Sequence, residues 1–345
     1  MSRHRVLSFD EKPGILRRRI ETWLKTLAGF LTMGGLIYAA LWLFNFSFEF
    51  KLGFWIVYPL LTVVGWWFSA KISLYVMKCT PADPNNPRDA RLLAIVDRVF
   101  AKTGLKYKPP VYISDNPLPN AFATGPIHSK AVVAATAGLF DCGMTDEEIE
   151  AVFAHELGHV YNYDVGINSL ISIMSSFFFL VVDSGVRAWV ATLEWFKRLI
   201  GMRPQTRVLP AILSNLLMYV IFWATQQLTK LIQMFVVRSR ESGADATGAH
   251  FTGNPCALAS GLLKLVAYVE KHRPKGRDAE AYRVMRVCMT VDPIFDSVTA
   301  EPAPKSLWDR LKAFWKYLQL THPPVPERVY QLERMNGGPC PLPKV

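Results

Sequence analysis

The residues best suited to chemistry lie in segment 144–164, MTDEEIEAVFAHELGHVYNYD. His155, Glu156 and His159 form the pattern H-E-x-x-H within it. On a helix, the i,i+4 spacing places both imidazoles on one side, where they can bind one zinc ion. Glu156 would then lie beside the water that the zinc activates and could take its proton. The pattern indicates a metalloprotease.

The same segment carries the signals of a helix that packs on a core. Thr145 and Glu148 form a capping box, in which each side chain satisfies a backbone N–H of the first turn. Apolar residues recur at helical spacing, namely Ile149, Val152, Phe153, Leu157 and Val160. Gly158 costs ~1 kcal/mol of helix propensity, so we expect it to let a neighbour approach closely. The cap and this glycine argue against the alternative, a surface helix with incidental histidines.

A hydrolytic zinc site generally needs a third protein ligand and keeps one position for water. Residues 162–169 hold no histidine that could serve, so the ligand must come from elsewhere. Glu241 is the candidate, because two hydrophobic runs separate it from His159 and return the chain to the side it left. Asp245 follows at i+4 and could hold a ligand histidine through its free ring N–H. A plain surface ion pair between Arg240 and Glu241 is the alternative.

Four stretches of the chain lack charged residues, namely 26–48, 52–70, 165–182 and 208–229. A bilayer core of ~30 Å needs about 20 apolar residues of helix, so each stretch is long enough or nearly so. Charged residues make up 19% of the chain, below the ~25% usual for soluble proteins. We therefore expect an integral membrane protein with four transmembrane helices. A buried core helix is the alternative for each run, above all for the short third run.

The basic residues beside these runs predict the orientation. Residues 1–25 hold seven lysines and arginines, and connection 49–51 holds one, so the N-terminus is expected in the cytoplasm. Loop 183–207 carries five, although four spans would place it outside; the alternative is that run 165–182 enters the membrane without crossing it. The net charge of +11 suggests an anionic partner. Anionic lipid explains the N-terminal surplus more simply than nucleic acid, so no nucleic-acid partner is expected.

The remaining segments, 71–164 and 238–345, together hold about 200 residues, enough for one soluble domain assembled from both. The expected organisation is a basic N-terminus at 1–25, two transmembrane helices at 26–70, the first part of a metalloprotease domain at 71–164, two further transmembrane helices at 165–237 and the second part of that domain at 238–345. Residues 271–305 are rich in charge and proline and predict a loop-containing insert.

The cysteines indicate the redox compartment. There are five, at positions 79, 142, 256, 288 and 340, and none forms a C-x-x-C pair. An odd, scattered set predicts reduced thiols in a reducing compartment rather than a disulfide framework.

Taken together, these elements resemble the HtpX family of membrane zinc metalloendopeptidases, whose distant relatives are the type I CAAX prenyl proteases. The resemblance rests on HELGH before one hydrophobic run and R-x-R-E-x-x-A-D, residues 238–245, after the next. Further matching segments are N-A-F-A-T-G at 120–125, V-A-A-T-A-G-L-F at 133–140, and T-H-P-P followed by E-R-V within 321–329. The segments follow the family order and cover roughly residues 25–335.

The resemblance implies one zinc ion per chain, bound by His155, His159 and Glu241, with Glu156 as the base. It also implies a bacterial inner-membrane location, an active site that faces the cytoplasm, and cleavage of membrane proteins in quality control and stress response. The fold class it implies is mainly α with a small β-sheet: multi-pass membrane helices plus a zincin-like domain. The expected partners are polypeptide substrates, in particular misfolded membrane proteins, and the lipid bilayer.

Two of the matching segments have alternative roles. By resemblance, His322 lies near the site and could donate to the oxyanion of the reacting carbonyl; the alternative is a packing histidine in the stiff turn made by Pro323 and Pro324. The β-prone run 131–140 could pair with an extended substrate as an added strand, or it could be a core strand without substrate contact. His128, His250 and His272 show no partner pattern and are expected to be ordinary residues.

Two other functions compete with the hydrolysis of membrane proteins. A CAAX-type prenyl protein endopeptidase is the runner-up, although such chains are longer and have more spans. A non-catalytic zinc-binding membrane scaffold would keep the site for its structure alone. The intact Glu156 argues against the scaffold, because a structural zinc site has no need of a base.

Overall fold

The computed structural model describes residues 48–171, 208–272, 306–310 and 322–343, with scattered positions between 24 and 42 and at 187, 191, 192 and 195. The expectations for the basic N-terminus, for part of run 26–48, for most of run 165–182, for most of loop 183–207 and for most of insert 271–305 concern residues outside this described part.

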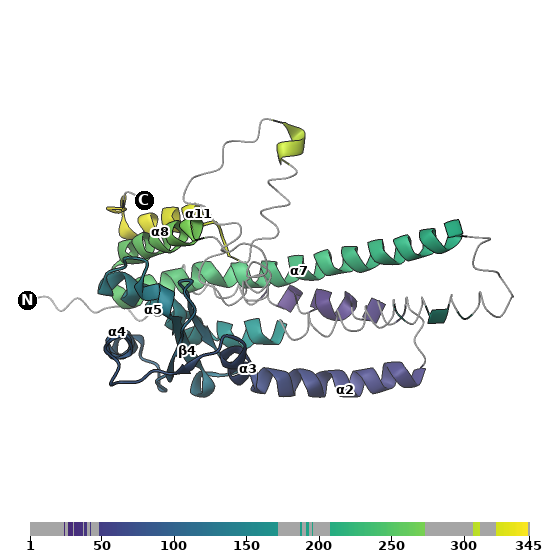
Figure 1. The fold of residues 1–345 in the computed structure, drawn as a ribbon, viewed down its shortest axis with the longest axis horizontal. Helices are drawn as coiled ribbons and strands as arrows, with labels where there is room; N and C mark the ends of the chain where they lie inside the picture. Colours follow the sequence, from purple (N-terminus) through teal and green to yellow (C-terminus); the bar gives the residue numbers. More distant parts are fainter. Residues whose placement is uncertain are drawn as a thin grey trace, which may run out of the picture.

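The described chain is mainly helical with one small sheet, as the sequence predicted. Its main elements are α2 (Phe48–Trp67), α3 (Ser69–Val76), β1 (Thr80–Pro81), α4 (Pro87–Thr103), β2 (Val111–Ser114), β3 (Ala121–Thr124), β4 (Val132–Thr136), α5 (Asp146–Tyr161), α7 (Val208–Thr252), α8 (Pro255–Lys271) and α11 (Val325–Asn336). Figure 1 shows α2 and α7 projecting from the same side of a domain that contains α4, α5, the sheet, α8 and α11. The hydrophobic core of this domain draws on residues from Leu92 to Val165 and from Ala249 to Leu332.

The sheet is mixed, with strand order β1-β2-β4-β3. Strands β2 and β4 are parallel, and the two outer pairs are antiparallel. All five residues of β4 are buried, and both of its edges are occupied by neighbouring strands. The interpretation of run 131–140 as the strand that pairs with substrate is therefore wrong, because an added strand needs an open edge. The core-strand alternative holds, and β3 is the outer strand on that side.

Helix α5 begins with the predicted capping box. The Thr145 hydroxyl accepts a hydrogen bond from the Glu148 backbone N–H at 3.3 Å, and the Glu148 carboxylate accepts one from the Thr145 N–H at 2.7 Å. Its expected apolar residues are all fully buried. From Ala151 to Val160 every residue of the helix is buried, because α4, α7, α8 and β3 all pack against it. Any polar side chain in this part of α5 must therefore be satisfied inside the domain.

Two glycines allow α5 and α7 to pack closely. A Cβ atom at Gly158 would meet the Ala244 carbonyl oxygen at 3.1 Å, and one at Gly248 would meet the backbone nitrogen of His155 at 2.7 Å. The expectation that Gly158 admits a close neighbour is confirmed. Because the two backbones nearly touch, short side chains of α7 reach the polar residues of α5.

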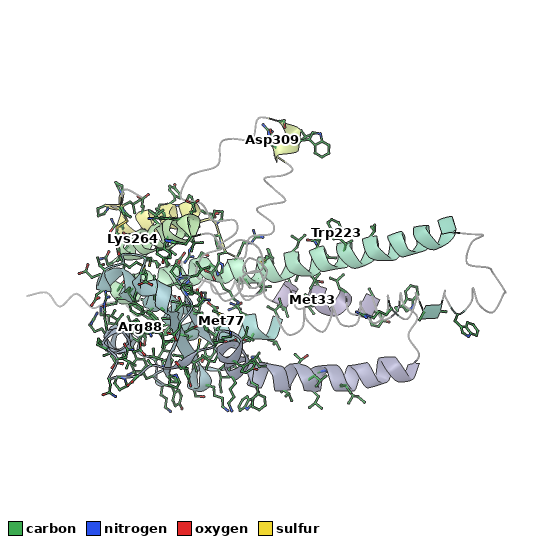
Figure 2. The ribbon with its side chains drawn as sticks, viewed as in Figure 1. Met33, Met77, Arg88, Trp223, Lys264 and Asp309 are labelled. Carbon is green, nitrogen blue, oxygen red and sulfur yellow. A yellow bond between two sulfur atoms is a disulfide. The ribbon has the colours of Figure 1, made fainter. Side chains whose placement is uncertain are left out.

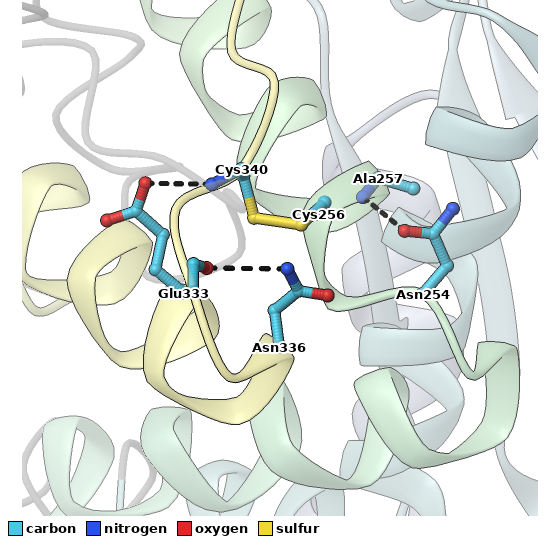
Figure 3. The surroundings of a disulfide bond; sticks show 7 residues. Asn254, Cys256, Ala257, Glu333, Asn336 and Cys340 are labelled. Carbon is cyan, nitrogen blue, oxygen red and sulfur yellow. Dashed lines mark hydrogen bonds between the residues drawn. A yellow bond between two sulfur atoms is a disulfide. The ribbon is translucent and has the colours of Figure 1, made fainter.

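A disulfide joins the C-terminal tail to α8 (Figure 3). Helix α11 packs against α8 and brings Cys256 and Cys340, 84 positions apart in sequence, to a Cα–Cα distance of 5.3 Å. The expectation of reduced thiols is wrong for this pair, because sequence spacing does not reveal which cysteines a helix contact brings together. Cys79 and Cys142 are free.

Apolar side chains of α2 and of the projecting part of α7 are exposed. Ile56 and Leu60 keep 64% and 61% of their surface accessible, and Trp223 lies on the part of α7 far from the domain (Figure 2). Among the described residues, no single helix combines the length and apolar character needed to cross a bilayer. One bent pair, Pro59–Trp67 with Ser69–Val76, meets both requirements when its two helices are taken together across a 63° bend.

The close contact of α5 and α7 predicts that Gly248→Ala is destabilising. Inside a helix, alanine normally gains roughly 0.5–1 kcal/mol over glycine. At Gly248 the new Cβ would meet backbone atoms of His155 and Ala154 at 2.7–3.0 Å, so the helices must separate. We expect a loss of about 1–3 kcal/mol, seen as a lower Tm in detergent-purified protein.

The matched control is Gly243→Ala on the same helix, where the nearest atom is Nδ2 of Asn162 at 3.9 Å. The control should keep or raise Tm. Equal stability of the two variants would contradict the packing described for Gly248.

Candidate active site

Helices α5 and α7 bring two histidines and a glutamate together. Nε2 of His155 lies 3.6 Å from Oε2 of Glu241, and Nε2 of His159 lies 3.3 Å from Oε1. All three side chains are buried, and one ligand atom from each lies within 4.8 Å of the others. Zinc at ~2.0–2.1 Å from each of two ligands in tetrahedral geometry holds them about 3.3 Å apart. The spacing of these atoms therefore suits a bound zinc ion.

The environment of Glu241 also fits a cation. Its Oε2 atom is buried and has no hydrogen-bond partner among the described residues, and the guanidinium Nη1 of Arg328 lies 3.9 Å away. An unsatisfied buried carboxylate oxygen is costly, and a metal ion would satisfy it. Burial alone would raise the pKa of Glu241, but His322 and the other two histidines hold that pKa well below its usual value. The carboxylate is thus in the charged form that a metal requires.

Each of the two histidines is held at its other ring nitrogen by a carboxylate. Nδ1 of His155 lies 2.8 Å from Oδ1 of Asp245, and Nδ1 of His159 lies 3.0 Å from Oδ2 of Asp164. An ionised carboxylate only accepts hydrogen bonds, so the ring proton lies on Nδ1 in both residues. Nε2 is thus the ring nitrogen of each histidine that faces the Glu241 carboxylate, and once it has given up its proton it can bind a metal ion.

Asp245 was a candidate in the sequence, whereas Asp164 was missed. Asp164 lies five residues after His159, beyond the end of α5, and the two are separated by a turn in which Tyr163 adopts a left-handed conformation with φ 63°. A tyrosine with positive φ is uncommon, so the sequence does not predict this turn. The available signal was the acidic residue that closely follows the motif.

A buried arginine pairs with each of these carboxylates. Nε of Arg328 donates to Oδ2 of Asp245 at 2.9 Å, and Nη2 donates to Oδ1 at 2.7 Å. Nη1 of Arg240 donates to Oδ1 of Asp164. Burial alone would raise the pKa of Asp245, but Arg328 and His155 lower it to about 2.

Neither arginine was identified from the sequence as part of the site. Arg240 and Arg328 are each only 1% exposed. The alternative of a surface Arg240–Glu241 pair is wrong, because both residues are buried and Arg240 pairs with Asp164. In the sequence, Arg328 was noted only as part of the E-R-V segment that resembles the family.

Glu156 lies between the histidines and the outer strand of the sheet. Its Oε2 accepts a hydrogen bond from the backbone N–H of Ala123 on β3 at 2.9 Å. Burial raises the pKa of the Glu156 carboxyl above its ordinary value, although the two neighbouring histidines oppose this. A carboxyl with a raised pKa beside a metal-binding group is suited to proton transfer.

His322 joins this cluster. Its Nε2 lies 3.6 Å from Oε1 of Glu241, and the residue is buried just before α11. The other described histidines lie elsewhere: the ring of His128 stacks on Tyr163, His272 bonds the Tyr268 carbonyl, and His250 is exposed near the end of α7.

Comparison with known proteins identifies the family. The pattern of "Peptidase family M48" matches residues 86–336. A protein named "Protease HtpX homolog" from Tropheryma whipplei (strain Twist) is 31% identical over 329 residues, which cover 94% of this chain and 98% of the relative. Proteins of the same name from Desulfatibacillum aliphaticivorans and Pyrococcus abyssi are 32% and 30% identical, and the alignments cover 78% and 80% of this chain and 75% and 83% of the relatives. The crystal structure of S. mikatae Ste24p aligns with a TM-score of 0.47 and 17% identity, covering 91% of this chain and 67% of that one.

The matched region includes every residue of the cluster, and the resemblance to the HtpX family is confirmed. The scaffold alternative is not supported, because both the family and the relatives are named for peptide hydrolysis. The chain therefore belongs to peptidase family M48 and is a metallopeptidase.

Proposed function

We propose that this chain is a zinc metalloendopeptidase that cleaves membrane proteins at the site formed by His155, Glu156, His159 and Glu241. The observation that carries the proposal is the convergence of two imidazole Nε2 atoms on one buried carboxylate. Two imidazoles and a carboxylate are typical ligands of hydrolytic zinc, whereas magnesium and calcium favour sites built from oxygen atoms alone. One ion per chain follows from one such group among the described residues.

Glu156 acts as the general base in this proposal. Zinc, when bound, polarises the scissile carbonyl and lowers the pKa of the attacking water. The carboxyl of Glu156 accepts the proton of that water and returns it to the leaving amine. The bond from Ala123 N–H orients the carboxyl before substrate arrives. His322 lies beside Glu241 and donates a hydrogen bond to the carbonyl oxygen as negative charge develops there.

Strand β3 is the proposed binding edge for the substrate. In the antiparallel register Ala123 lies opposite Val133, and its N–H donates to Glu156 instead of to β4. Residues 121 and 123 therefore direct their backbone groups away from β4, toward the outer edge. An extended peptide that pairs with this edge would lie beside Glu156.

A membrane location is supported by the four charge-free runs and by the exposed apolar side chains of α2. Helix α7 continues without a break from the fourth run to the residues of the site. The basic residues near the first two runs favour a site on the cytoplasmic side, and a bacterial inner-membrane enzyme of protein quality control and stress response fits that placement. A disulfide such as Cys256–Cys340 is more usual on an oxidising side of a membrane, and fused reporters distinguish the two sides.

The role of Glu156 predicts that Glu156→Gln keeps its zinc but loses activity. No ligand is removed, whereas loss of a positioned acid–base group typically costs 10²–10⁴-fold in rate. Zinc content and cleavage of a membrane-protein substrate are measured on the same detergent-purified sample. Glu147→Gln, an exposed position on the same helix, should behave like the wild type. Near-normal cleavage by Glu156→Gln would reject this mechanism.

The proposed ligand set predicts that Glu241→Ala loses more bound zinc than Asp245→Asn does. The first change removes a ligand, and the second removes only the charge that holds His155, which typically costs 10–100-fold in metal affinity or activity. Metal analysis after mild chelation measures the difference. Glu270→Ala, an exposed glutamate of α8, is the control. Full zinc stoichiometry in Glu241→Ala would mean that the third ligand lies elsewhere.

The proposed topology predicts the behaviour of fused reporters. A reporter that is active only in the cytoplasm should work at the C-terminus and fail in loop 183–207. Activity at both places would mean that run 165–182 does not cross. Activity only in the loop would place the active site, with its disulfide, on the opposite side of the membrane.

A further inference from the structure

The two zinc-binding histidines proposed above are held by two arrangements of the same kind. On one side, His155 contacts Asp245, which is paired with Arg328. On the other side, His159 contacts Asp164, which is paired with Arg240. We call these the Arg328 arm and the Arg240 arm. All members are buried, with exposures of 8% or less.

The residues of each arm come from different elements. His155 and His159 lie on α5, Asp245 and Arg240 lie on α7, Asp164 follows α5, and Arg328 lies on α11. Arg328 and His155 are 173 positions apart in sequence. Each arm therefore ties α5 to another element through charged side chains that are almost completely buried.

Packing alone does not account for the arginines. Burying a guanidinium and a carboxylate together costs desolvation that their attraction often fails to recover, and apolar residues of the same size are frequently as stable. A buried pair of this type is best attested where it imposes one specific arrangement. In each arm, the carboxylate oxygen that does not contact the histidine accepts a hydrogen bond from the arginine.

The Arg328 arm shows how an arginine can impose that arrangement. Nε and Nη2 of Arg328 donate to the two different oxygens of Asp245, so the planar fork fixes the plane of the carboxylate. Oδ1, in that fixed position, lies 2.8 Å from Nδ1 of His155. With Nδ1 held there, the ring of His155 keeps Nε2 directed at Glu241.

We propose that Arg328 and Arg240 are positioning residues that fix the two histidines in the metal-binding orientation, Arg328 through Asp245 and Arg240 through Asp164. The inference rests on the proposed zinc site. It also makes the docking of α11 part of metal binding, because α11 supplies Arg328 and is held at its far end by the Cys256–Cys340 bond.

A double-mutant cycle on zinc affinity tests the proposal in the full-length protein. Arg328→Met and Asp245→Asn should each weaken zinc binding by about 10–100-fold, measured by competition with a chelator. The double variant should lose no more zinc affinity than the more strongly affected of the two single variants, because both changes break the same arm. Arg328→Met combined with Asp164→Asn should lose clearly more zinc affinity than either change alone, because the two changes release different histidines.

Cobalt substitution adds a readout that a purely structural role would not change. The visible absorption of bound Co²⁺ reports ligand geometry, so it should shift in Arg328→Met and stay constant in Arg334→Met, an exposed position on the same helix. Arg328→Lys is included because it keeps a positive charge beside Asp245 and should fold even if Arg328→Met does not. It lacks the two-nitrogen fork and should still weaken zinc binding and shift the spectrum.

Three results would overturn the proposal. The first is a wild-type zinc affinity and cobalt spectrum in Arg328→Lys, and the second is the same result in a folded Arg328→Met. The third is a loss of zinc affinity in the Arg328→Met, Asp245→Asn double variant that equals the product of the two single losses. In each of these cases the wild-type protein still binds zinc, so the proposed function stands. A wild-type protein that binds neither zinc nor cobalt in stoichiometric amount would overturn the proposed function itself, and this inference with it.

Discussion

The close contact between α5 and α7 is the constraint on which the site depends. Glycines at 158 and 248 let the two backbones approach until any Cβ there would meet the other helix at 3.1 Å or less. At that distance a glutamate and an aspartate one turn apart on α7 reach two histidines one turn apart on α5. With larger residues at these positions, the helices would lie further apart and the shorter Asp245 would lose His155 first. The geometry of the cluster is thus set by backbone contact before any side chain is considered.

This contact has an electrostatic consequence. Because every residue of α5 from Ala151 to Val160 is buried, every charged group that this part of the helix faces must be neutralised inside the domain. Four carboxyl groups lie around the centre, those of Glu156, Asp164, Glu241 and Asp245, against the guanidinium groups of Arg240 and Arg328. If metal binding displaces the histidine protons and all four carboxyl groups are ionised, four negative and two positive charges leave two negative charges, which a divalent cation would balance. The arginines and the metal would therefore neutralise the same group of carboxylates together.

The sequence predicted what local spacing determines. The i,i+4 histidines, the capping box and the apolar positions of α5 depend only on helix geometry, and the structure shows the cap and the buried positions where they were expected. Glu241 could be proposed because the hydrophobic runs imply where the chain returns. Asp164, Arg240 and Arg328 could not be, because they depend on a left-handed Tyr163 and on the docking of α11. The roles of β3 and β4, like the disulfide, depend in the same way on contacts between distant segments.

The continuity of α7 links the site to the proposed membrane position. Thr229, the last residue of the fourth charge-free run, and Glu241 lie twelve positions apart on one helix. At 1.5 Å per residue this is roughly 18 Å along the helix axis, a separation that cannot change without breaking α7. An extended chain advances about 3.3–3.6 Å per residue, so on the proposed placement a substrate leaving the bilayer needs about five or six residues to cover this separation. The rigid helix that supplies the third ligand would thereby also set how far from the membrane a bond must lie to be cleaved.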